Sequence, residues 1–518
     1  FQGDTGSIYT HDVSGTDSTA TYNTAYGLTA LDAVTTADYN VAIGYGAGGA
    51  ITTSGYNTFV GANAGLVHTT LDGGAVNTGI GYGALTALTT GGENVALGGN
   101  AGAGLTTAEH TVFIGHNAGD GHDAENDNIG IGKDALGGSV AGGEYNVAVG
   151  NYALDALTSG DNNTAVGYNA LTADTAGNKS VAIGYGALAS QNFTSSTDTE
   201  NVAVGYNAGT ALTTGDYNTF IGGNVGIGVT TGTNNTMIGR YAGGNFDEED
   251  HNIAIGRNAF AGPISGGEYN LIIGNLAGDA ITSADSNVFL GHQAGAVTTT
   301  GGYNTFIGGS HASYVGAANT EGSFNTFIGA DSGRSNVTGT LKTIIGAKAN
   351  TNGNTGSHEI VIGYNVTGGG QNKIRIGYGS DYIENTYTSD ANWSFGSDER
   401  LKDNIQSDNL GLAFINELRT VTYNWKASDK LDNSLPGYMS SDTKDFDKLC
   451  KDTSVTMNGL IAQEVKAALD KVGADDSKYG VWSTDENGIQ RISTNSFVMP
   501  LIKAVQELST KVKALEEA

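Results

Sequence analysis

Acidic side chains that could bind a metal ion are concentrated in one short run, Asp247-Glu248-Glu249-Asp250-His251. Carboxylate oxygens and imidazole nitrogens are ligands that calcium and transition metals accept in proteins. The run lies between repeats, however, and it lacks the Gly-Gly-x-Gly-x-Asp pattern of calcium-binding β-rolls. The sequence therefore favours a solvated turn, and it predicts neither a metal site nor a cofactor.

Other residues that commonly carry chemistry are widely spaced. The histidines show no His-Glu-x-x-His pattern, no nucleotide-binding loop is present, and the single cysteine, Cys450, can form no intrachain disulfide. Paired carboxylates could hydrolyse a glycan, but no acidic position recurs regularly along the chain. Degradation of a surface polysaccharide stays open as an alternative, because distant residues can be brought together by folding.

Most of the chain is a repeat built on the phrase Asn-Thr/Val-x-Ile/Val-Gly. It occurs 21 times, and 14 of the 20 spacings between its glycines are 17 residues. A fixed period with a few small insertions predicts one structural turn per copy and insertions in loops. We therefore predict a mostly β protein with a parallel β-solenoid or β-roll shaft over residues 21–380. At about 4.8 Å per strand, this shaft is roughly 100 Å long.

Positions within the repeat are counted here from its glycine, called the repeat glycine. Residues −3 and −1 are almost always β-branched or aliphatic and share one face of a strand, whereas residue −2 points to the other face. We predict that positions −3 and −1 fill the coil. Position −2 would then form an outward apolar face through which chains associate; its largest members are Phe59, Phe220, Phe289, Phe306 and Phe327.

Two polar or flexible positions of the repeat also carry predictions. Position −4 is asparagine in 16 of 21 copies, so stacked amides should form a hydrogen-bonded ladder along the coil. The alternative is a row of amides that bind a ligand. The repeat glycine should adopt a positive φ at a bend.

Composition divides the chain near residues 380–396. The part before Ser397 holds 75 of the 81 glycines and −24 of the formal charge of −29. We assign residues 1–20 to an N-terminal connector, 381–396 to a linker and 397–518 to a second, α+β domain. The acidic charge makes nucleic acid and anionic membranes unfavourable partners, and no apolar run is long enough to insert in a membrane.

The last 122 residues contain four ordered phrases: Ser397-Asp-Glu-Arg-Leu-Lys402, Val421-Thr-Tyr-Asn-Trp425, Gly459-Leu-Ile-Ala-Gln-Glu-Val465 and Pro500-Leu-Ile-Lys-Ala-Val-Gln-Glu-Leu508. Together they resemble the C-terminal intramolecular chaperone of phage tail spikes and tail fibres, of the type found in endosialidases. The resemblance implies a domain that helps three chains to trimerise and then cuts itself off. The shaft phrase also resembles the head repeats of trimeric autotransporter adhesins, whose usual period is 14 residues.

The same resemblance implies a catalytic pair. Ser397 would be the nucleophile and Lys402 the base, with cleavage at or beside the Gly396–Ser397 bond. A lysine base must be neutral, so burial or a nearby cation would have to lower its pKa. The residues alone also fit a helix start, because a serine cap followed by Asp398 and Glu399 suits a helix N-terminus.

The terminal segment 496–518 is predicted to be a helix with a coiled-coil seam. The seam has 3-4-3-4-3 spacing and consists of Val498, Leu501, Val505, Leu508, Val512 and Leu515. Three heptads suit a short clasp, although one amphipathic helix packed on its own domain has the same pattern.

These features predict a homotrimeric phage tail fibre, located in the virion tail and extracellular. Its partners would be other tail proteins and a glycan or protein receptor on the host. The alternatives are a tail-spike enzyme that degrades polysaccharide and a cellular surface adhesin with the same chaperone domain.

Overall fold

The computed structural model describes residues 7–9, 19–69, 75–139, 141–309, 314–387, 403, 405–406, 408–424, 426, 456–475, 480–484 and 488–518. Contacts within the chain divide it into two compact units. These are residues 1–396, here called the shaft unit, and residues 397–518, here called the C-terminal unit.

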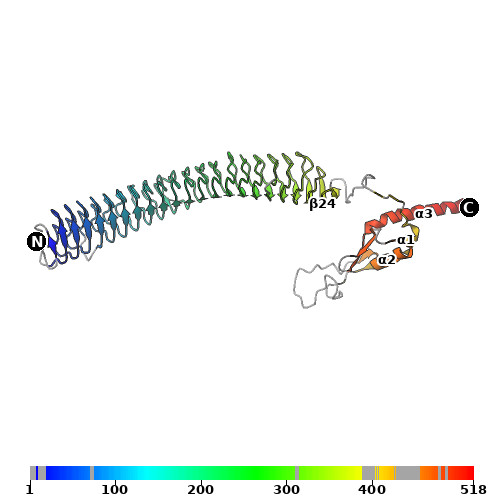
Figure 1. The fold of residues 1–518 in the computed structure, drawn as a ribbon, viewed down its shortest axis with the longest axis horizontal. Helices are drawn as coiled ribbons and strands as arrows, with labels where there is room; N and C mark the ends of the chain where they lie inside the picture. Colours follow the sequence, from blue (N-terminus) through cyan, green and yellow to red (C-terminus); the bar gives the residue numbers. More distant parts are fainter. Residues whose placement is uncertain are drawn as a thin grey trace. The chain divides into compact units, whose positions relative to one another are not determined.

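The shaft unit is a single coil with one continuous sheet of 23 strands. Each repeat gives one short strand that runs parallel to, and in register with, the strand of the next repeat, as β3 pairs with β4. Inserted residues do not disturb this register, since Thr58 lies opposite Thr78 despite the 20-residue spacing. Figure 1 shows the strands stacked one after another along the unit. The predicted parallel β-solenoid is confirmed.

The strands of this sheet are short and regularly spaced. They are β1 Ile8–Tyr9, β2 Thr24–Tyr26, β3 Val41–Ile43, β4 Thr58–Val60, β5 Thr78–Ile80, β6 Val95–Leu97, β7 Val112–Ile114, β8 Ile129–Ile131, β9 Val147–Val149, β10 Thr164–Val166, β12 Val181–Ile183, β14 Val202–Val204, β15 Thr219–Ile221, β16 Thr236–Ile238, β17 Ile253–Ile255, β18 Leu271–Ile273, β19 Val288–Leu290, β20 Thr305–Ile307, β21 Thr326–Ile328, β22 Thr343–Ile345, β23 Ile360–Tyr364, β24 Lys373–Tyr378 and β25 Asp381–Thr386. A separate two-stranded sheet pairs β11 Gly177–Asn178 with β13 Thr197–Asp198.

The prediction for the two faces of each strand is wrong. Position −2 points into the coil: Phe59, Phe220 and Phe289 are fully buried. Positions −3 and −1 face outward and are at least partly exposed in every repeat strand, as in Val41 and Ile43. The reason is the width of the coil. A three-residue strand can send only its central side chain inward, and the asparagine at −4 occupies the same inward face by period-two alternation.

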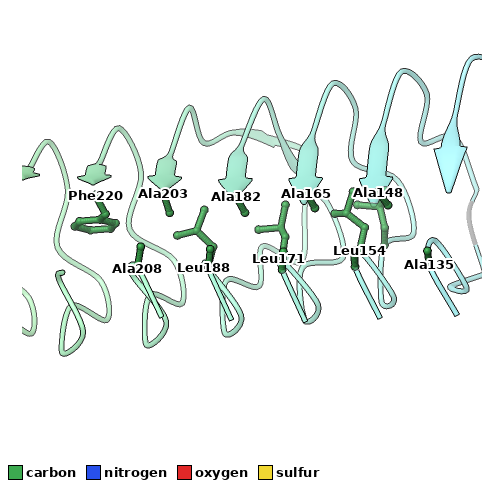
Figure 2. Packing of buried hydrophobic residues seen from close by; sticks show 14 of the residues in the cluster. Ala135, Ala148, Leu154, Ala165, Leu171, Ala182, Leu188, Ala203, Ala208 and Phe220 are labelled. Atoms are coloured by element: carbon green, nitrogen blue, oxygen red, sulfur yellow. The ribbon is translucent and has the colours of Figure 1, made fainter. Parts of the chain in front are cut away.

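Side chains from two walls of the coil fill its interior, and a large side chain on one wall faces a small one on the other. Alanine at −2 faces leucine at +4, as in Ala165 with Leu171 and Ala182 with Leu188 (Figure 2). Where −2 is phenylalanine, a glycine faces it: a Cβ on Gly65 would lie 2.5 Å from the Phe59 ring. Turns with both alanine and glycine, such as Ala42 with Gly48, are filled from the turns beside them, as close packing requires. A Cβ on Gly48 would lie 3.1 Å from Leu31 and 3.4 Å from Phe59.

The repeat glycine is required where successive turns touch. Gly44 has φ +134°, and a Cβ there would lie 2.5 Å from the carbonyl oxygen of Gly61 in the next turn. The predicted positive φ is confirmed for every repeat glycine from Gly27 to Gly363. Only glycine combines this backbone conformation with so close an approach.

The asparagine ladder is confirmed, and its bonds run mainly to the backbone. The Asn146 side-chain oxygen accepts from the Asn163 amide N–H at 2.9 Å, while its Nδ2 donates to the Gly160 carbonyl at 2.9 Å. Most of these amides are completely buried. They satisfy backbone groups that water cannot reach, so they do not form a row of ligand-binding groups.

The C-terminal unit is α+β. Its elements are α1 Leu412–Glu417, β26 Val421–Tyr423, β27 Met457–Gly459, α2 Ala462–Lys471, β28 Trp482–Thr484, β29 Gln490–Ile492, the 3₁₀ helix η4 Thr494–Phe497 and α3 Val498–Glu516. Phe414 and Phe497 stack in its core with ring centroids 6.2 Å apart. Among the described residues of the chain, no helix is long and apolar enough to cross a membrane.

Two adjacent glycines allow a direct test of the contact between turns. Gly222 is a repeat glycine with φ +140°, and its added Cβ would lie 2.8 Å from the Gly239 carbonyl carbon, whereas a Cβ on Gly223 would meet nothing within 4 Å. We expect Gly222→Ala to lower the free energy of unfolding by at least about 2 kcal/mol through strain and overlap. Gly223→Ala should change it by less than about 0.5 kcal/mol. Denaturant unfolding followed by circular dichroism measures both, and equal effects would contradict the role given to the repeat glycine.

Candidate functional site in the C-terminal unit and polar networks of the shaft

The predicted catalytic residues, Ser397 and Lys402, lie outside the described residues. Their pairing therefore stays a prediction. Three of the four sequence phrases behind the resemblance do fall, wholly or largely, in the described part of the unit.

These phrases form one packed structure. β26, from the second phrase, pairs antiparallel with β27, so that Val421 lies opposite Gly459 at the start of the third phrase. The third phrase continues into α2, whose Val465 is buried in the same core as Phe414 of α1. An ion pair between Arg419 and Glu464 also joins the segment before β26 to α2.

The fourth phrase forms most of the first half of α3 and fixes this helix to α1. A carboxylate oxygen of Glu507 accepts the Leu412 amide N–H at 2.9 Å, at the N-terminus of α1. Pro500 and Ala504 are buried, so they mark the side of α3 that faces its own unit. A negative charge beside a helix N-terminus is electrostatically favourable.

The predicted seam of α3 lies on a different, uncovered side. Its members are between 45 and 78 % exposed: Val498, Leu501, Val505, Leu508, Val512 and Leu515. Within one chain, packing on its own unit therefore does not account for the heptad pattern. An apolar groove of about 690 Å³ opens beside the seam, with Leu501 as part of both. The groove is lined by Ile415, Leu418, Thr420, Val421, Thr422, Asn458, Gly459, Leu460, Phe497 and Leu501.

A comparison with known families matches the same part of the chain. Residues 397–474 match the family model described as Chaperone of endosialidase. The match begins at the first residue of the C-terminal unit, spans both Ser397 and Lys402, and ends shortly after α2. No curated protein matches the chain. The chain therefore carries a chaperone-of-endosialidase module at the end of a β-solenoid shaft.

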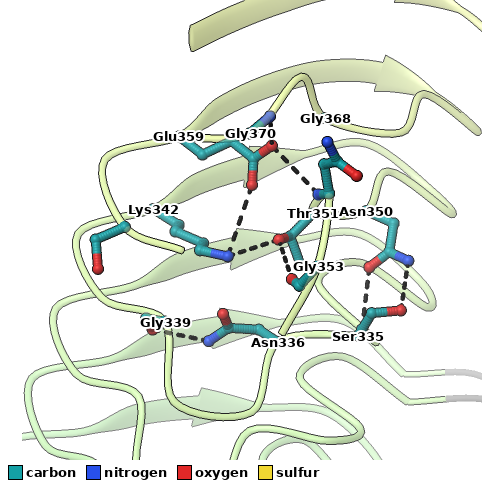
Figure 3. A network of polar contacts seen from close by, with 12 residues as sticks. Ser335, Asn336, Gly339, Lys342, Asn350, Thr351, Gly353, Glu359, Gly368 and Gly370 are labelled. Atoms are coloured by element: carbon teal, nitrogen blue, oxygen red, sulfur yellow. Dashed lines mark hydrogen bonds and ion pairs between the residues drawn. The ribbon is translucent and has the colours of Figure 1, made fainter. Parts of the chain in front are cut away.

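The last turns of the shaft replace the asparagine ladder with buried charges (Figure 3). Lys342 and Glu359 occupy position −4 of successive turns, are at most 2 % exposed, and approach to 3.6 Å. Lys342 also donates to the Thr351 hydroxyl at 2.6 Å, and Glu359 accepts from the Gly370 amide at 2.8 Å. Burial lowers the pKa of Lys342, and the Glu359 charge partly offsets that shift.

The charged series continues to the edge of the sheet. Lys373, at position −4 of the last repeat, pairs with Glu384 of β25 at 2.8 Å. β25 runs antiparallel to β24, whereas the strands before it along the coil are parallel to one another. The departures from asparagine at 342, 359 and 373 therefore mark a cap on the coil. Charged side chains and a reversed strand at the end of a sheet disfavour further strand addition.

The sequence suggested that the acidic run Asp247–His251 is a solvated turn. In the structure this run is only partly solvated. Glu249 is only 5 % exposed, and its carboxylate accepts the amide N–H groups of Asp247 at 2.7 Å and of Gly266 at 2.8 Å. Glu125 makes the same kind of bond to Gly142. In both places the following repeat has 18 residues, one more than the usual 17. The buried glutamate therefore binds a backbone amide in the turn that contains the extra residue. No group of three or more metal-ligating side chains occurs among the residues that the structure describes.

Two histidines that seemed scattered in the sequence occupy a core position. His68 and His122 both lie at +7, where other repeats have Leu88 or Leu105, and both are completely buried. Burial lowers the pKa of each ring to about 4. Alignment of the repeats to position +7 is the sequence signal that identifies them.

The His122 environment predicts a pH-dependent stability. The unfolded chain binds a proton at this ring below about pH 6.5, whereas the folded chain does so only near pH 4, so stability falls as pH drops between these values. At pH 4.5 this ring alone should cost roughly 2–3 kcal/mol relative to pH 7.5. His122→Leu should reduce the loss by that amount in urea unfolding at the two pH values, and the exposed control His292→Gln should not. An unchanged pH dependence in His122→Leu would contradict the assignment.

The energetic coupling between Lys342 and Glu359 can be tested by replacing both residues with the asparagine that occupies position −4 in earlier turns. Glu359→Asn leaves the Lys342 charge buried without its carboxylate, and we expect a loss of about 3–5 kcal/mol in the free energy of unfolding. The double variant Lys342→Asn/Glu359→Asn recreates the asparagine pattern of earlier turns and should recover most of that loss. Thermal unfolding of both variants measures the coupling. A double variant that is no more stable than Glu359→Asn would mean that the two residues do not act as a pair.

Proposed function

We propose that this protein is a homotrimeric phage tail fibre that attaches the virion to its host, and that its C-terminal unit assembles the trimer and then cuts itself off. The observation that carries the proposal is the chaperone-of-endosialidase module joined to a long solenoid of similar turns. Such a shaft has one continuous hydrogen-bonded register over 23 strands. A chaperone that aligns chains at one end suits this architecture, because each turn contacts only its neighbours and folding can propagate along the coil from that end.

The uncovered seam of α3 supports a trimeric clasp. Six exposed aliphatic residues at heptad spacing form an apolar surface of the kind that a partner helix covers. In the assembled protein, the α3 helices of three chains would bury these residues against one another. The receptor of the fibre would be a glycan or protein on the host surface, and the fibre would join other tail proteins at its far end.

Self-cleavage would use Ser397 and Lys402. The neutral Lys402 amine accepts the hydroxyl proton as the Ser397 oxygen attacks the carbonyl carbon of the scissile peptide. The peptide C–N bond then breaks, the nitrogen leaves with a proton, and water hydrolyses the resulting ester to regenerate the hydroxyl. The products are a mature shaft and a released C-terminal unit.

Substitution of the proposed nucleophile tests this chemistry. The wild-type chain should yield two fragments that separate near residue 396, whereas Ser397→Ala and Lys402→Ala should stay full-length because the nucleophile or its base is missing. Ser394→Ala, three residues upstream, is the matched control and should cleave normally. Denaturing gels of boiled samples report cleavage, and light scattering of the native sample reports the number of chains. An intact wild-type chain would contradict self-cleavage, and a monomer would contradict the fibre.

A further inference from the structure

The outward face of the shaft sheet is uncharged along its length: 32 of its 42 side chains are aliphatic, nine are threonine and one is tyrosine. It consists of positions −3 and −1 of the 21 repeats, here called the outer strip. Every residue of the strip is at least partly exposed, including Ile43, Leu97 and Ile183 at 39, 47 and 39 %. The inward side chains of the same strands point to the opposite side, as Ala165 and Ala182 do in Figure 2.

The composition of the strip differs from that of the positions beside it. None of its 42 side chains is charged, and position −1 is aliphatic in every repeat except at Tyr26. Position −5, which flanks the strand, is more variable and contains Glu93, Asp127, Lys179 and Glu200. A solvated strip would accept charges as its flank does, so the absence of charge indicates that the strip is covered in the working protein.

The size of the strip suits a stable interface. With a strand spacing of about 4.8 Å and a rise of about 3.3 Å per residue, 21 three-residue strands present a face of about 1,000 Å². This exceeds the apolar patches of typical monomers, which reach a few hundred Å². It is close to the roughly 800 Å² that each partner contributes to a specific protein interface.

The regular register decides which partner fits. Since every strand is in register with its neighbours despite the insertions, the strip rises by the same step at every turn. A partner that contacts it along its whole length must have the same step, and a second copy of this chain does. The shaft unit has a formal charge of −24, and chains of like charge associate more readily through a face that carries none.

We propose that the outer strip is the surface through which the shafts of parallel chains pack together around a common axis. This inference rests on the proposed trimer and identifies its shaft interface. Positions −5 and +1 lie on either side of the strip. When parallel chains pack around one axis, position −5 of each chain faces position +1 of the next chain in the same repeat. The one repeat with full charges at both positions has Asp127 at −5 and Lys133 at +1, and these charges are opposite, as the in-register arrangement favours; within one chain Lys133 also pairs with Asp134 at 3.0 Å.

Site-specific cross-linking in the full chain tests the surface. Ile183→Cys places a thiol in the strip, and Ser190→Cys places one on an exposed residue of the same turn. Ser190 is two residues after Leu188, and Leu188 lies across the coil interior from Ala182 (Figure 2). Ser190 therefore belongs to the wall of the coil opposite the strand. Both variants are made on a Cys450→Ser background and treated with a short bismaleimide. We expect Ile183→Cys to form covalent oligomers and Ser190→Cys to remain monomeric on denaturing gels.

The outcomes separate this inference from the proposed function. A trimer by light scattering without Ile183→Cys cross-links, or with equal cross-links from Ser190→Cys, overturns the outer-strip interface and leaves the fibre intact. A monomer overturns the fibre itself. Val204→Cys repeats the test one turn further along if Ile183→Cys does not fold. Protection of the strip thiol from a maleimide-polyethylene glycol, with rapid labelling of Ser190→Cys, gives a second readout of the same surface.

Discussion

The structure depends on the closeness of successive turns of the coil. Each repeat glycine lies so near the next that a single Cβ would overlap the adjacent backbone, as Gly44 shows against Gly61. This contact brings neighbouring strands to hydrogen-bonding distance and leaves their amides and carbonyls without water. The asparagines then satisfy the backbone groups that the strands do not, for example at Asn146. Glycine and asparagine therefore act together: one permits the approach, and the other satisfies the polar groups that it buries.

A narrow coil also explains the packing of its interior. Few side chains fit inside each turn, so a large residue on one wall requires a small one on the other. Phe59 with Gly65 and Ala165 with Leu171 are two solutions, and Ala42 with Gly48 is a third, in which Leu31 and Phe59 of the adjacent turns fill the space. The same limit turns positions −3 and −1 outward, which leaves a shaft with an apolar outer face. The internal packing of one chain thus creates the surface by which we infer that several chains associate.

The sequence predicted the solenoid, its period, the glycine conformation and the asparagine ladder, because each follows from a residue that recurs at a fixed spacing. It failed on the direction of Phe59, since alternation shows which residues share a face but does not show which face is inside. The asparagine that recurs at −4 lies on the same face as −2. A ladder of such amides suits the inside of the coil, so this residue could have identified the inward face. Glu249 was misjudged because its backbone partner, Gly266, lies in the next turn. Ser397 and Lys402 were proposed by resemblance, and their geometry depends on tertiary contacts that spacing along a chain cannot supply.

The in-register pairing of nearly identical strands has a consequence for how such a fibre changes over evolutionary time. Because every turn offers the next the same set of hydrogen bonds, a duplicated or deleted 17-residue segment meets matching neighbours on both sides. Each duplication would lengthen the shaft by about 4.8 Å while its cross-section stays the same. The reach of the fibre can thus be adjusted one turn at a time, independently of the cap formed by β25 and of the module that follows it.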